Sequence, residues 1–91
     1  MSDLGDSSQP RLAVGCRWVG EGESRTLVYP EGALRLQETA RAILDRCDGE
    51  RTFEKIVREL AATYNVSDPT RIRQDVAAFL ERLRQKRLVD F

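Results

Sequence analysis

The apolar residues of this chain change their spacing at Gln37, and this change limits the folds that the chain can adopt. From Arg11 to Gln37 they alternate in short runs separated by glycine, which is typical of half-buried strands. Beyond Gln37 they recur three and four residues apart, which is typical of amphipathic helices. The sequence therefore predicts an α+β fold in which a small sheet comes first and helices follow.

The first part of the chain predicts a three-stranded antiparallel β-meander. The strands are expected near residues 16–19, 24–29 and 33–36. Glycine-containing segments at 20–23 and 30–32 supply the turns between them. A sheet of three short strands is not stable alone, so one of its faces is expected to pack on helices.

The second part predicts three α-helices. The first has an apolar stripe over residues 40–47 and ends before Gly49, which suits the left-handed position after a helix. Thr52 can cap the second helix through its hydroxyl. Asp68 followed by Pro69 is a strong start signal for the third and longest helix. The order of strands and helices is similar to that of a winged helix-turn-helix domain.

The length of the chain leaves room for one core. Its 91 residues are 41% hydrophobic and 33% charged, as in a globular domain rather than a disordered one. Residues 1–9 are polar and acidic and predict a flexible tail, so residues 10–91 are expected to form a single domain. The first ten residues do not form a secretory signal and no run could span a membrane, so we expect a cytoplasmic protein with no membrane partner.

The composition excludes several kinds of catalytic chemistry. There is no histidine, which removes histidine-based triads and histidine-ligated metals. Cys16 and Cys47 do not form a CxxC pair, and in the cytoplasm we expect both to be reduced and to act as small apolar residues. No phosphate-binding glycine loop and no defensible acid–base pair is present. We therefore expect a protein that is not an enzyme and needs no cofactor or metal.

Charge is unevenly distributed although the formal net charge is zero. Residues 71–91 contain six basic and three acidic residues, which gives them a net charge of +3. A basic last helix in a winged-helix order makes DNA binding an alternative hypothesis. The acidic remainder of the chain would repel a duplex, and the zero net charge argues against a nucleic-acid partner, so we expect none. Asp75 lies at the border of this helix's apolar stripe, where it either anchors the helix by capping or pairing with an arginine, or contacts a partner.

The meander also leaves an open edge at the strand of residues 33–36. Its unpaired backbone groups are a template for an added strand. An extended peptide can pair there and place its side chains between this strand and the third helix. A second copy of the chain can use the same groups, which gives a homodimer by strand exchange. The sequence does not separate these two interpretations.

A series of short motifs in a fixed order resembles the PqqD family over residues 10–89. In order, they are Tyr29-Pro30-Glu31-Gly32, Leu34-Arg35-Leu36, Thr39-Ala40, Ile43-Leu44, Cys47-Asp48-Gly49, Arg51-Thr52, Ile56-Val57, Leu60, Tyr64, Asp75-Val76, Phe79-Leu80 and Leu83. Two positions depart from the family pattern: Gln37 stands where the family usually has asparagine, and Arg87 where a glycine usually follows the last helix.

The resemblance implies a peptide chaperone of pyrroloquinoline quinone biosynthesis. PqqD-like proteins bind the ribosomally made precursor peptide PqqA and present it to the radical SAM enzyme PqqE, which crosslinks a glutamate and a tyrosine of the peptide. In that family the peptide adds a strand beside the third strand and packs on the third helix. The residues at the matching places in this chain are Ala33, Leu34, Arg35, Leu36, Gln37, Arg71, Asp75, Val76 and Phe79.

Two further expectations concern the partner. Arg71 and Arg73 are candidates to pair with acidic residues of the peptide or of the enzyme. The same peptide-binding role in another modified-peptide pathway is the alternative that keeps this fold.

Overall fold

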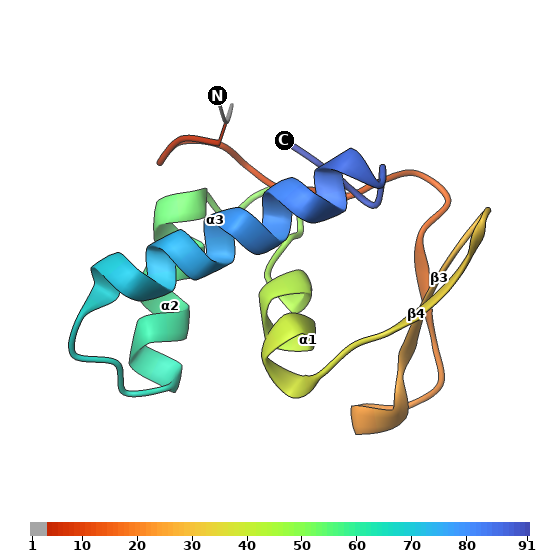
Figure 1. The fold of residues 1–91 in the computed structure, drawn as a ribbon, viewed down its shortest axis with the longest axis horizontal. Coiled ribbons are helices and arrows are strands. Elements are labelled where there is room, and N and C mark those ends of the chain that lie inside the picture. The colour runs from red at the N-terminus through yellow and green to blue at the C-terminus, as the bar shows by residue number, and fades with distance from the viewer. Residues whose placement is uncertain (1–3) are drawn as a thin grey trace.

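The computed structural model describes residues 4–91, and its main elements follow the predicted order (Figure 1). The strands of the larger sheet are β2 (Arg17–Val19), β3 (Thr26–Tyr29) and β4 (Gly32–Arg35). The helices are α1 (Glu38–Asp45), α2 (Phe53–Thr63) and α3 (Pro69–Gln85). The α+β fold, with an antiparallel meander followed by three helices, is confirmed. The likeness to a winged helix-turn-helix domain stays a prediction.

The sheet has the strand order β2-β3-β4 and packs one face on the core. Trp18 and Leu34 both pair with Leu27 of the central strand, and Leu27 is fully buried. β3 is shorter than predicted at its start because residues 22–24 form a turn of 3-10 helix, the element η1 (Gly22–Ser24). Strand alternation then places the neighbouring residues on the opposite face of the sheet.

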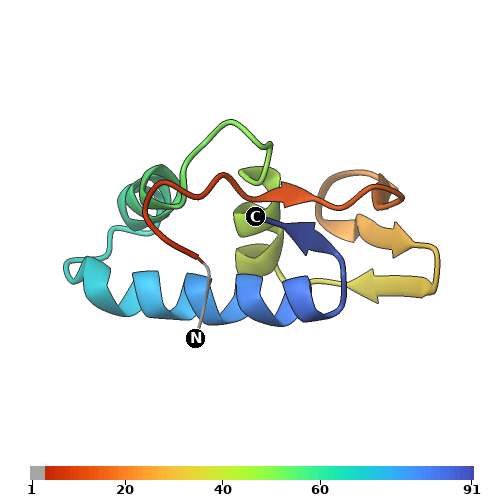
Figure 2. The same cartoon turned by 90° about the horizontal axis from the view of Figure 1, so that it is seen from above.

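The long helix α3 lies across α1 and α2 (Figures 1 and 2). Its buried residues are Val76, Leu80 and Leu83. They pack with the buried faces of α1 and α2 and with Leu27 of the sheet in one core. The predicted caps are in place: the Thr52 side chain accepts a hydrogen bond from the Lys55 amide, and Asp68 accepts one from the Thr70 amide. The core therefore holds the three helices and the sheet in a fixed arrangement.

A second, two-stranded sheet was not predicted. It consists of β1 (Arg11–Leu12) and β5 (Val89–Asp90), which pair antiparallel (Figure 2). The sequence predicts only a short extended segment at residues 88–89 and does not predict its partner. This pairing brings residues 89–90 beside residues 11–12, and both Leu88 and Val89 are buried in the core.

The segment of residues 4–9 lies against the start of α2. The amide of Phe53 donates a hydrogen bond to the Ser8 carbonyl at 2.7 Å, and the amide of Glu54 donates one to the Asp6 carbonyl at 3.1 Å. These bonds satisfy two of the amides that a helix start leaves free. The flexibility expected of residues 1–9 stays a prediction, and residues 1–3 lie outside the part of the chain that the structure describes.

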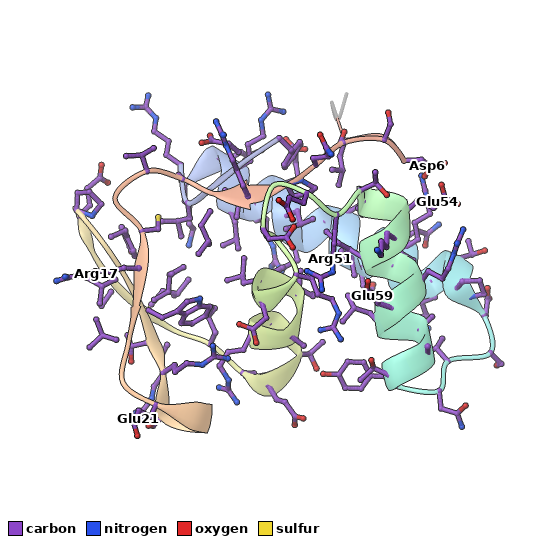
Figure 3. The ribbon with its side chains drawn as sticks, turned by 180° about the vertical axis from the view of Figure 1, so that it is seen from behind. Asp6, Arg17, Glu21, Arg51, Glu54 and Glu59 are labelled. Atoms are coloured by element: carbon purple, nitrogen blue, oxygen red, sulfur yellow. The ribbon has the colours of Figure 1, made fainter. Side chains whose placement is uncertain are left out.

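A group of ion pairs joins α1 to α2 (Figure 3). Glu59 accepts from both Arg46 and Arg51, each with an N–O distance of 3.2 Å. Asp48 accepts from the amides of Glu50 and Arg51, and these hydrogen bonds lower the pKa of the Asp48 carboxyl. This group fixes the chain between the two helices, where Gly49 has the predicted left-handed conformation.

Helix α3 ends in a Schellman motif, with Arg87 in the left-handed position. The amide of Leu88 donates to the Leu83 carbonyl and that of Arg87 to the Arg84 carbonyl. Arg87 has φ of 63°, a conformation that favours glycine. Arg87, where the family usually has glycine, therefore occupies a position whose left-handed backbone conformation favours glycine.

We predict that Arg87→Gly stabilises the protein. Glycine removes the strain of the left-handed conformation, and its greater freedom in the unfolded chain offsets part of this gain. The free energy of unfolding should rise by about 0.5–1 kcal/mol, measured by urea denaturation. Arg87→Ala, which keeps the strain, is the control and should give no such increase. A decrease for Arg87→Gly would contradict the role assigned to this position.

Candidate functional site

A groove of about 710 Å³ opens between the end of β4, α1 and α3. The last turn of α2 and the loop that follows it close one end. The residues that line it are Arg35, Leu36, Gln37, Thr39, Ala40, Ile43, Leu60, Tyr64, Val66, Ser67, Asp68, Arg71, Ile72, Asp75, Val76, Phe79 and Arg82. A groove of this size and shape can hold several side chains of an extended peptide.

The groove has an apolar floor and a charged rim. Ile43, Leu60 and Val76 are buried and belong to the hydrophobic core as well as to the floor. The rim is exposed and carries the side chains of Arg35, Arg71, Asp68, Asp75 and Arg82. An apolar ligand side chain can therefore enter the floor while charged neighbours on the ligand meet the rim.

Helix α3 supplies one complete wall of the groove. Arg71, Asp75 and Phe79 are four residues apart, so they follow one another along the same face of the helix. Of the two roles considered for Asp75, capping or pairing with an arginine is not what the structure shows: the described part of the chain offers it no ion pair within 4.0 Å. Asp75 is exposed on the groove wall instead.

Seven of the nine residues expected to bind a peptide line this groove, three from β4 and its exit and four from α3. The other two, Ala33 and Leu34, lie on β4 outside it: Ala33 is exposed, and Leu34 packs against the core. Their expected role rests on the backbone of the strand. The assignment of all nine residues to peptide binding stays a prediction.

The structure places Arg73 outside the groove, so the groove does not support its expected pairing with the peptide, and its expected pairing with the enzyme stays a prediction. Its side chain pairs with Asp6 and lies 4.9 Å from the centre of the Phe53 ring, on the side of α3 that faces residues 4–9 and the start of α2. Arg71 and Arg73 are two residues apart, so they point to different sides of the helix. Of the two, only Arg71 faces the groove.

The free edge of β4 runs into the groove. Tyr29 and Gly32 flank the two-residue turn and form a hydrogen-bonded pair, and such pairs alternate with non-bonded ones along an antiparallel ladder. The backbone N–H and C=O groups of Ala33 and Arg35 therefore point away from β3, toward an edge that no described strand occupies. This free edge ends at Leu36, whose carbonyl accepts a hydrogen bond from the Arg41 guanidinium.

Several groove residues were not predicted from the sequence. Tyr64 fits the apolar stripe of α2, and Val66 lies in a loop without periodicity, yet both line the groove and are 37% exposed. Arg41 does not line the groove, but it was not predicted either: it is buried and binds the Leu36 carbonyl at the junction of β4 and α1. Their signal in the sequence is weak because no single-residue pattern distinguishes a groove wall from a core.

Comparison with known proteins assigns the chain to a family. The family model described as "Coenzyme PQQ synthesis protein D (PqqD)" matches residues 25–89, which include the groove. This chain belongs to the PqqD family.

Curated members of the PqqD family match nearly the whole chain. The "PqqA binding protein" of Stutzerimonas stutzeri is 37% identical over 83 residues, which cover 89% of this chain and 88% of the relative. The protein of the same description from Azotobacter vinelandii is 34% identical over 87 residues, covering 96% and 92%.

A solved PqqD structure has the same fold. It is the solution structure of the PqqD truncation of Methylobacterium extorquens PqqCD, described as a functional and stand-alone recognition element for ribosomally synthesized and post-translationally modified peptides. It superposes with a TM-score of 0.78 at 32% identity and covers 97% of this chain and 95% of its own.

Within residues 4–91 of this PqqD chain, no group of three or more histidine, cysteine or acidic side chains could hold a metal ion. No helix in that range is long and apolar enough to cross a membrane. Cys47 is buried, and its burial raises the pKa of the thiol to about 12. Cys16 is partly exposed, and desolvation raises the pKa of its thiol as well. Both thiols are therefore poor nucleophiles in the folded protein.

We predict that the two thiols differ in their rate of alkylation. At pH 8 iodoacetamide should alkylate Cys47 at least about 100-fold more slowly than Cys16. The reason is that a pKa of about 12 leaves almost no thiolate at Cys47 and that its side chain is buried. Mass spectrometry of peptides after timed quenching measures both rates. In urea the two rates should become similar. Equal rates in the folded protein would contradict the burial of Cys47.

Proposed function

We propose that this protein binds the precursor peptide PqqA as an added strand along β4 and presents it to the radical SAM enzyme PqqE. The observation that carries the proposal is the free β4 edge opening directly into an apolar groove. The names of the relatives support the choice of peptide, because they are described as PqqA binding proteins. The description of the Methylobacterium extorquens structure supports peptide recognition as the general role.

Backbone pairing supplies affinity that does not depend on the peptide's side chains. A strand added beside β4 exchanges hydrogen bonds with the free N–H and C=O groups of Ala33 and Arg35. Every second side chain of that strand then points toward α3, because side chains alternate between the two faces of a strand. Those side chains enter the groove, where Phe79 and Ile72 contact them from the helix.

The charges of the rim supply selectivity. Three arginines (Arg35, Arg71 and Arg82) and two aspartates (Asp68 and Asp75) line the groove, and Asp68 already caps α3. A peptide in which acidic residues accompany apolar ones therefore fits better than a basic peptide.

Presentation requires no catalytic group from this chain. The peptide is held by one edge of its added strand, and its remaining residues stay available to an enzyme. We infer that the protein is a binding module that acts in the cytoplasm. A homodimer formed by strand exchange would occupy the same β4 edge, so dimer formation and peptide binding would compete.

Ala33→Pro tests the backbone pairing. Proline removes the N–H that faces the free edge, and its ring obstructs an incoming strand, while an exposed edge position tolerates it in the free protein. The dissociation constant for synthetic PqqA, measured by isothermal titration calorimetry, should rise at least about tenfold. Ala33→Val is the matched control, since it keeps the N–H and favours strands, and it should bind as the wild type does. Unchanged binding by Ala33→Pro would refute strand addition at β4.

Ala40→Trp tests the groove. Ala40 lies on α1 and lines the groove, so a large ring there takes the space that the peptide's side chains would fill. PqqA affinity should fall about tenfold or more. Ala62→Trp places the same ring on an exposed position of α2 outside the groove and should leave affinity unchanged. If the two variants bind PqqA equally, the peptide lies elsewhere.

A further inference from the structure

The larger sheet has an outer face that no described element covers. Strand register sets the two rows that form it: Arg17 with Val28 and Ala33, and Val19 with Thr26 and Arg35. We call these six residues the outer sheet face. Its edge residues are exposed, and Figure 3 shows Arg17 pointing away from the molecule. The opposite face carries Leu27 and packs on the core.

Two exposed large apolar residues lie outside the groove. Among the residues that the structure describes, the large apolar side chains that are exposed belong to Val14, Val19, Tyr64 and Val66. Tyr64 and Val66 line the groove, whereas Val14 is 96% exposed just before β2 and Val19 is 47% exposed on β2. Val19, Val28 and Ala33 form an apolar strip on the outer sheet face. Clusters of exposed apolar residues mark interaction surfaces more often than isolated ones do.

The outer sheet face also carries positive charge. Some arginines of the molecule are paired with acids, such as Arg25 with Asp45 and Arg46 with Glu59. Arg17 and Arg35 have no such pair within 4.0 Å in the described part of the chain, and none of the six face residues is acidic. The outer sheet face is therefore an apolar strip with two available cations.

We propose that the outer sheet face is the docking surface for the enzyme that receives the peptide, through an enzyme surface on which carboxylates surround apolar side chains. This inference rests on the proposed function for the identity of the partner. A second copy of the chain fits less well, because an interface between two outer sheet faces brings arginines together without any acid on either face.

The position of the face suits this role. The peptide groove lies between the end of β4 and α3, on the core side of the sheet, whereas the outer sheet face points the other way. A peptide and an enzyme can therefore occupy the protein together. The two surfaces meet at Arg35, which belongs to both, so the peptide would leave the groove beside the docked enzyme.

Arg17→Glu tests the docking surface without touching the groove. Sedimentation velocity or biolayer interferometry with purified PqqE should show that the substitution raises the dissociation constant at least about tenfold. The affinity of the wild type for PqqE should fall as salt is added. Affinity for PqqA should stay within about twofold of the wild type. Val19→Ser, which removes apolar area from the same face, should also weaken PqqE binding selectively.

Lys55→Glu is the matched control. It reverses the same charge at an exposed position of α2, where an acid facing Thr52 completes a capping box and preserves folding. It should bind PqqE as the wild type does. Normal PqqE binding by Arg17→Glu overturns the docking assignment. So does a wild type that is dimeric in solution together with an Arg17→Glu variant that is monomeric, because the face would then join two copies of the chain. Failure of the wild type to bind PqqA would overturn the proposed function instead, which the separate peptide titration shows.

Discussion

The burial of one stripe of α3 supports every other part of this structure. Val76, Leu80 and Leu83 belong to a single core together with buried residues of α1, α2 and the sheet. Each contributes about 1.5–3 kcal/mol through the apolar surface it removes from water. Val76 is also part of the groove floor. The packing that stabilises the fold therefore shapes the candidate site, and a shift of α3 would alter both.

Two features around this core are uncovered, namely the edge of β4 and the apolar groove. A protein without partners is expected to cover such features. The β4 edge is unpaired among the described residues, and the groove beside it exposes apolar side chains. Open strand edges and exposed apolar patches favour aggregation. Their occurrence side by side, in a member of the PqqD family, is what makes strand addition the simplest account of the site. Arg41 limits the edge by binding the Leu36 carbonyl, so an added strand has a defined end.

Much of this architecture could be predicted from local patterns. Apolar spacing located the meander and the helices, and the Asp68-Pro69 pair marked the start of α3 because capping chemistry is local. The pairing of β1 with β5 could not be predicted, since two-residue strands at opposite ends of the chain carry no periodic signal. For the site, the resemblance indicated the strand and the helix that line the groove. It did not separate Arg71 from Arg73, whose different directions depend on the rotation of α3, nor did it reveal Tyr64 and Val66, which become groove residues only through tertiary packing.

The proposed function depends on PqqA becoming a fourth strand beside β4. Isotope-filtered NOE measurements on labelled protein with unlabelled PqqA can locate the peptide at this edge. We expect backbone contacts from the peptide to Ala33 and Arg35, together with side-chain contacts to Ile72 and Phe79. Backbone contacts confined to the β2 edge, or peptide contacts with no part of α3, would contradict it.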